Sequence, residues 1–111
     1  ALVLLNDPCY VEAARWMGLR ILREGGATTL QRLAHGFRMV TARRASERER
    51  ELLTRAHEQQ AAVFQADPAA AAALLEVGES SVPDRVDPVE LAIWAELSSL
   101  LLNLDEAITR G

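Results

Sequence analysis

The residues of this sequence best suited to chemistry are carboxylates and amides near its two ends. Asn103, Asp105 and Glu106 lie close together near the C-terminus, and Asn6 and Asp7 lie near the N-terminus. Adjacent carboxylates can serve as acid and base or bind a hard cation, if folding adds a third oxygen ligand and partial burial. These five residues form our candidate polar cluster. The structural alternative, which we favour, makes Asp7 a helix N-cap, Asn103 a helix C-terminal residue and the others solvated.

The two histidines lack the spacing of metal ligands. Neither His35 nor His57 has a histidine or glutamate three or four residues away. That spacing is what places two ligands on one helix face. The sequence also has no Cys-x-x-Cys-His motif, which excludes covalent haem attachment within this piece. We therefore expect no metal site and no cofactor in this chain.

Recognisable nucleophile motifs are missing as well. Ser80 lies in Gly-Glu-Ser-Ser-Val, which lacks the second glycine of a nucleophile elbow. The sequence has no lysine, which removes Schiff-base and phosphate-loop chemistry. Cys9 is the only cysteine, so no internal disulfide can form, and no His or Lys lies close to it in sequence. We predict no catalytic residue and expect no enzymatic activity from the isolated chain.

Charge is distributed unevenly along the chain. Residues 1–60 carry ten arginines against seven acids, whereas residues 61–111 carry two against nine, for a net charge of −4. Nucleic-acid binders usually show a concentrated basic face and a high pI. We predict that the two halves complement each other within one fold and that the chain binds no nucleic acid.

Helix starts are marked by several local signals. Asp-Pro pairs at residues 7–8, 67–68 and 87–88 each place an N-cap acceptor before the residue best suited to the first helical position. Thr28 or Thr29 and the pair Ser46 with Glu49 give two further starts, and Gly25-Gly26 ends the first helix. The pattern predicts an all-α compact bundle of about five helices, at residues 8–24, 29–42, 47–66, 68–77 and 88–104, in a single domain spanning residues 1–111.

Apolar spacing predicts the inward face of the first three helices. The third helix has the thinnest stripe, so we expect it on the surface of the bundle. The predicted inward residues are Tyr10, Val11, Ala14, Met17, Ile21 and Leu22 in the first helix, Leu30, Leu33, Ala34, Phe37 and Val40 in the second, and Leu52, Ala56 and Val63 in the third.

The last helix is apolar around most of its circumference. Such a helix is either central in its bundle or covered by another chain segment. We hypothesise that part of it, together with Trp16 on the outer side of the first helix, packs on protein outside this chain. The candidate interface consists of Trp16, Ile93, Leu97, Leu100 and Leu104.

The N-terminal end is apolar but short. Residues 1–5 fall far below the length of a signal peptide's apolar region or a membrane span, so we predict no membrane span. Because the sequence does not begin with methionine, we expect a fragment or a processed chain.

Three stretches together resemble a known family: Ala-Leu-Val-Leu-Leu-Asn-Asp-Pro at residues 1–8 followed by Val-Glu-Ala-Ala at 11–14, Leu-Leu-Glu-Val-Gly-Glu-Ser at 74–80, and Leu-Leu-Asn-Leu-Asp-Glu at 101–106. The chain resembles the C-terminal helical domain of unknown function in large exported planctomycete-type proteins that often carry cytochrome-c-like domains. Two positions depart from the family. Ala-Arg-Arg-Ala at 42–45 replaces a Gly-Arg-Pro-Pro-like turn, and Ala107 replaces an aromatic residue.

The resemblance implies an exported or periplasmic setting and a multidomain parent protein, of which this chain is the C-terminal fragment. It implies that any haem of the parent lies in a separate domain. Our leading hypothesis is a non-catalytic helical domain that packs against upstream domains of the same polypeptide or associates with itself. The alternative is that the polar cluster contributes carboxylates to a composite periplasmic site that acts on a polysaccharide or binds a cation.

Overall fold

A computed structural model describes residues 8–76 and 85–110, with side chains described for residues 12–76 and 85–104. The described residues form five helices and no strand: α1 (Pro8–Glu24), α2 (Thr29–Thr41), α3 (Glu47–Ala66), α4 (Pro68–Leu75) and α5 (Pro88–Arg110). The predicted all-α bundle of about five helices is therefore confirmed. Three ends differ from prediction: α2 ends one residue earlier, at Thr41, and α4 ends at Leu75. Helix α5 continues to Arg110 because no helix breaker lies between Leu104 and Arg110.

The helix starts follow the predicted capping signals. The hydroxyl of Thr28 accepts a hydrogen bond from the backbone N–H of Gln31, and that of Ser46 accepts one from the backbone N–H of Glu49, each at 3.1 Å. Both sites form complete capping boxes. At the later starts, carboxylate oxygens of Asp67 and Asp87 accept backbone N–H groups at 3.2 and 3.0 Å. Asp7 lies outside the described residues.

Two helices end in left-handed backbone. Gly26 has φ 97° after α1, as its residue type predicts. Ala42 has φ 58° and ψ 22° after α2, and its N–H donates to the Arg38 carbonyl oxygen at 2.9 Å. A non-glycine residue in this conformation is strained by its Cβ atom.

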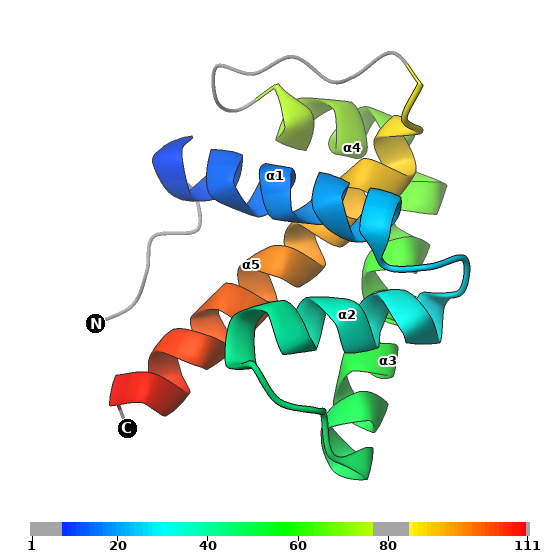
Figure 1. The fold of residues 1–111 in the computed structure, drawn as a ribbon. Coiled ribbons are helices and arrows are strands. Elements are labelled where there is room, and N and C mark those ends of the chain that lie inside the picture. The colour runs from blue at the N-terminus through cyan, green and yellow to red at the C-terminus, as the bar shows by residue number, and fades with distance from the viewer. Residues whose placement is uncertain (1–7, 77–84, 111) are drawn as a thin grey trace.

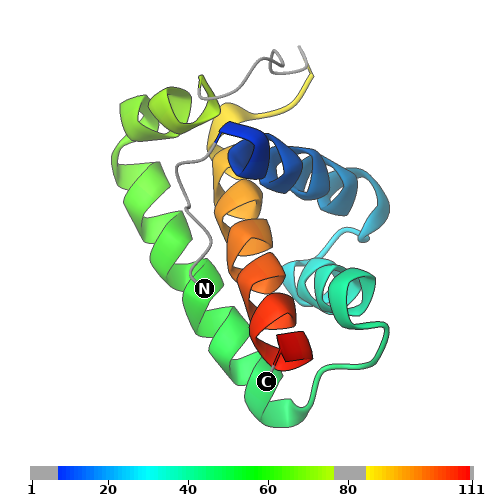
Figure 2. The ribbon, with the colours of Figure 1, turned by 90° about the vertical axis from the view of Figure 1, so that its left-hand side faces the viewer.

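Helix α5 runs through the middle of the bundle (Figure 1). Viewed from the side, α5 lies between α3 and the pair formed by α1 and α2 (Figure 2). The α1–α5 crossing is close because Gly18 has no side chain: a Cβ there would lie 2.8 Å from the Ala95 nitrogen. The largest fully buried side chains are Trp94, Phe37, Ile21, Leu91, Ile93, Leu97 and Leu101.

The predicted inward faces are partly wrong. In α1, Ala14 and Ile21 are buried as expected, and Leu33 and Phe37 are buried in α2. Side chains of residues 10 and 11 lie outside the described set.

In α2 and α3, four predicted inward residues face water: Leu30, Ala34, Leu52 and Val63 are exposed. In α3 the core contacts come instead from Leu53 and Phe64, one residue further along. One residue is about 100° around a helix, so Leu52 and Val63 were predicted on the wrong face of α3, whereas Ala56 packs against the core as predicted. Leu30 is the second residue of α2, in its first turn after the N-cap Thr28.

Candidate functional site

The polar cluster is not tested by the structure. Of its five members, only Asn103 has a described side chain, which is half-buried on α5. Asn6 and Asp7 lie outside the described residues, and so do the side chains of Asp105 and Glu106. Its role in acid–base or cation chemistry stays a prediction.

The candidate interface divides into buried and exposed members. Ile93 and Leu97 have no exposed surface, which corrects their assignment to an interface. They lie in the part of α5 that the other helices surround, so they belong to the core of this domain. Trp16, Leu100 and Leu104 are exposed, with 52%, 40% and 38% of their surface accessible.

The exposed members lie on two separate surfaces. Leu100 shares an outward stripe of α5 with Glu96 and Asn103, at spacings of four and three residues, and Leu104 adjoins it. We call Glu96, Leu100, Asn103 and Leu104 the open face of α5. Trp16 lies about 200° around α1 from Ala14, which is buried. It therefore faces away from the core and from α5.

Two charged side chains at or beside the open face are partly or fully buried: Glu96 and Arg15. Partial burial raises the pKa of the Glu96 carboxyl above its usual value. Arg15 is buried on α1, where its Nη1 donates to the carbonyl oxygen of Leu75 and its Nη2 lies 3.9 Å from a carboxylate oxygen of Glu12. Arg15 thus ties α1 to the end of α4. The cavity beside these residues is about 10 Å³, far too small for a substrate.

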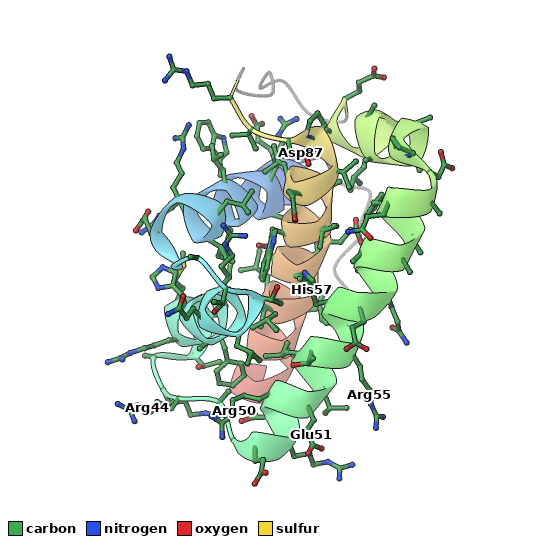
Figure 3. All side chains as sticks on the ribbon, turned by 90° about the vertical axis from the view of Figure 1, so that its right-hand side faces the viewer. Arg44, Arg50, Glu51, Arg55, His57 and Asp87 are labelled. Carbon is green, nitrogen blue, oxygen red and sulfur yellow. The ribbon has the colours of Figure 1, made fainter. Side chains whose placement is uncertain are left out.

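A larger groove lies where α2 ends and α3 begins. Its volume is about 450 Å³. Its polar lining consists of His35 and Arg38 from α2, Arg44 from the connecting loop and Arg50 from the first turns of α3, and two alanines complete it. We call this the arginine groove. In Figure 3, Arg44 and Arg50 lie next to each other at this junction, and Arg55 and Glu51 lie on the outer side of α3.

The arginine groove was not predicted from the sequence because its charges come from three different elements. A local signal was present: residues 38–50 contain five arginines and two acids. Comparing the net charge of residues 1–60 with that of residues 61–111 does not reveal this local excess of arginine at residues 38–50. Only the folded loop shows which of the five arginines share a surface.

The histidines occupy different environments. His57 is half-buried on α3 (Figure 3). Its ring packs against Trp94 of α5 with ring centroids 5.3 Å apart. His35 lines the arginine groove, and its Nε2 atom is buried without a hydrogen-bond partner among the described residues. Within that part of the chain, no three His, Cys, Asp or Glu residues are grouped so that they could hold a metal ion.

The described residues thus define an all-α helical bundle with one open helix face that carries two exposed leucines and one arginine-lined groove. Comparison with family models, curated proteins and solved structures gives no match. The family resemblance therefore stays a prediction. None of the described helices is long and apolar enough to cross a membrane.

Proposed function

We propose that this chain is a non-catalytic helical interaction domain that packs against the upstream domains of a larger exported protein. The observation that carries the proposal is the open face of α5, where Leu100 and Leu104 keep 40% and 38% of their surface in water. Burying apolar surface stabilises a contact by about 25 cal/mol per Å². Grouped exposed apolar side chains are typical of interaction sites.

The open face continues a helix that is otherwise a core element. Residues 91–95 of α5 are buried on every side, whereas from Glu96 onward one side faces water. A partner on this side would complete the burial of α5 without any rearrangement of the bundle. Trp16 offers a second, separate contact on α1, because a large aromatic side chain in water gains from burial in a partner.

The test is binding between this chain and the upstream part of its polypeptide, produced separately and measured by calorimetry. The double variant Leu100→Gln with Leu104→Gln should weaken binding by about tenfold or more, because it removes two apolar anchors. Leu52→Gln with Val63→Gln is the matched control, since both residues are exposed on α3, outside the open face. Equal loss in the two double variants would contradict the proposal.

The oligomeric state gives a second test. Light scattering should show that the isolated chain does not form a stable dimer through α5. If it does self-associate, and if Leu100→Gln with Leu104→Gln abolishes this, the occupant of the open face is a second copy and not an upstream domain.

Trp16 can be followed by its own fluorescence. The chain has two tryptophans, and Trp94 is buried with an indole N–H that lacks a partner among the described residues. Trp94→Phe therefore leaves Trp16 as the only indole, at a modest packing cost. Its emission should shift to shorter wavelength on addition of the upstream part if Trp16 is a contact. An unchanged emission maximum despite binding would limit the interface to α5.

A further inference from the structure

The arginine groove concentrates positive charge that the described residues do not neutralise. The ion pairs in the described part of the chain involve Arg15, Arg20 and Arg43. None of them involves Arg38, Arg44 or Arg50, and no carboxylate lines the groove. Three guanidinium groups around one groove repel one another, and this repulsion is relieved when an anion binds between them.

The loop that carries Arg44 is held by several polar contacts. Arg43 donates to both carboxylate oxygens of Glu49, each at 2.9 Å, and its guanidinium carbon lies 4.9 Å from the centre of the Phe37 ring. The Thr41 hydroxyl donates to the Phe37 carbonyl oxygen at 2.8 Å. The guanidinium group of Arg43 therefore stabilises the loop through Glu49 and Phe37, whereas its neighbour Arg44 lines the groove.

These contacts reduce the ordering cost of binding, because the backbone of the groove is already set. Its three walls are the last turns of α2, the loop and the first turns of α3. Two of the three arginines, Arg38 and Arg50, come from helices, and the third comes from a loop that Arg43 and Glu49 fix. A preformed site binds its ligand with a smaller entropy cost for ordering its backbone and side chains.

We infer that the arginine groove binds a small, multiply charged oxyanion of the phosphate class, such as a phosphate or pyrophosphate group. Guanidinium groups match the oxygens of phosphate in pairs and stay charged at every physiological pH. The volume of about 450 Å³ lies in the range of small-ligand sites. The site is independent of the open face of α5.

The charge of the rest of the molecule favours a small anion over a long polyanion. The chain carries a net charge of −4, and residues 61–111 hold nine of its acids. A nucleic acid or an extended acidic polypeptide would have to pass beyond the groove and meet this negative charge. A compact phosphate group can stay within the groove, whose polar lining is three arginines and His35.

The experiment is calorimetric titration of the chain with sodium pyrophosphate and with inorganic phosphate, at constant ionic strength set by sodium chloride. Pyrophosphate should bind more tightly than phosphate, because it can engage more than one guanidinium. Arg44→Gln and Arg50→Gln should each weaken pyrophosphate binding by about tenfold, the loss of one charge-assisted hydrogen-bonded pair. Substitution of these exposed side chains should leave the fold intact, as circular dichroism would verify.

The matched control is Arg55→Gln. Arg55 is exposed on α3 like Arg50, and its substitution makes the same change in net charge, but it does not line the groove. Its effect on pyrophosphate binding should be less than about twofold, since only long-range screening changes. A second control is Arg23→Gln on α1, which is exposed as well.

Three results would overturn the inference. One is the absence of heat and of any arginine Nε–H shift in NMR spectra at millimolar pyrophosphate. Another is equal weakening by all four substitutions, which would mean that only net charge attracts the ion. The third is binding of an oligoglutamate peptide with no binding of pyrophosphate, which would assign the groove to an acidic polypeptide. If phosphate and pyrophosphate bind equally, a single free phosphate is the ligand group, whereas stronger binding of pyrophosphate favours a phosphorylated small molecule.

Discussion

Two regions of this bundle are held together in different ways. At the α1–α5 crossing the backbones touch, with Gly18 of α1 against Trp94 and Ala95 of α5, and the surrounding side chains are buried and apolar. At the α2–α3 corner, which comprises residues 41–50, the chain is held by polar contacts that water can reach. The crossing depends on close packing, so one added methyl group is enough to change the stability of the fold. The corner depends on several weak contacts, each of which is replaceable.

This difference indicates where binding can arise without loss of the fold. Arg44 and Arg50 lie in the corner, Arg38 lies just before it, and all three are exposed. Substituting exposed residues usually changes stability by less than about 0.5 kcal/mol. A ligand site at the corner can therefore vary while the crossing keeps the helices in place.

The largest expected effect comes from Gly18→Ala at the crossing. Its Cβ would lie 2.8 Å from the Ala95 nitrogen and 2.9 Å from the Trp94 carbonyl carbon. Both are backbone atoms, so α1 has to move away from α5. We expect the free energy of unfolding to fall by about 3 kcal/mol, the upper part of the range for overpacked cores. Urea denaturation monitored by circular dichroism measures it.

Gly36→Ala is the control for this comparison. Its Cβ would lie 2.8 Å from the Ile21 Cδ1 atom and 3.1 Å from the Leu101 Cδ1 atom. These are the ends of side chains, which can rotate away, and alanine gains about 1 kcal/mol of helix propensity over glycine at either site. Gly36→Ala should therefore lose less than half as much stability. Equal losses would show that close backbone approach is not what limits the crossing.

A smaller effect of opposite sign is expected from Ala42→Gly at the corner. Ala42 has φ 58°, where a Cβ is crowded and glycine is not. We expect this substitution to raise the free energy of unfolding by about 0.5–1 kcal/mol. Ala45→Gly is the matched control, because Ala45 is not among the positive-φ residues of the described chain, and it should lower stability instead. A loss of stability in both variants would mean that Ala42 carries no strain.

Helix starts could be predicted from the sequence because each depends on residues within one turn. Ser46 and Glu49 make their capping box from their own neighbours, as do Thr28 and Gln31. The end of α5 could not be predicted in the same way, because no local signal marks it. The six residues after Leu104 are compatible with continued helix, and the helix continues to Arg110.

Packing could be predicted only where the apolar stripe was strong. Phe37 and Ile21 were assigned correctly to the core, whereas the weak stripe of α3 gave Leu52 in place of Leu53. For α5, apolar residues around the whole helix left two possibilities open. The structure separates them: Ile93, Leu97 and Leu101 are buried within the bundle, while Leu100, on a different side of α5, faces water. That separation depends on where the other helices pack against α5, which no window of sequence contains.

The smallest effect that separates the two regions is the pH dependence of the corner. Hydrogen bonds from Arg43, and then from the Ser46 backbone, lower the pKa of the Glu49 carboxyl from its usual 4.5 to about 2. Because the folded pKa is depressed, this contribution is complete above about pH 4.5 and is lost as the pH falls toward 2. Glu49→Gln should therefore be less stable than the wild type at pH 7, and the difference in urea midpoint should close as the pH falls from about 4.5 to 2.

Glu51→Gln makes the same charge change on α3, without an ion pair in the described part of the chain. Its difference in urea midpoint from the wild type should be smaller at every pH. Because salt screens a water-exposed ion pair, the difference in urea midpoint between Glu49→Gln and the wild type should also shrink in 1 M sodium chloride. A difference independent of salt and pH would mean that the capping hydrogen bonds alone hold the corner.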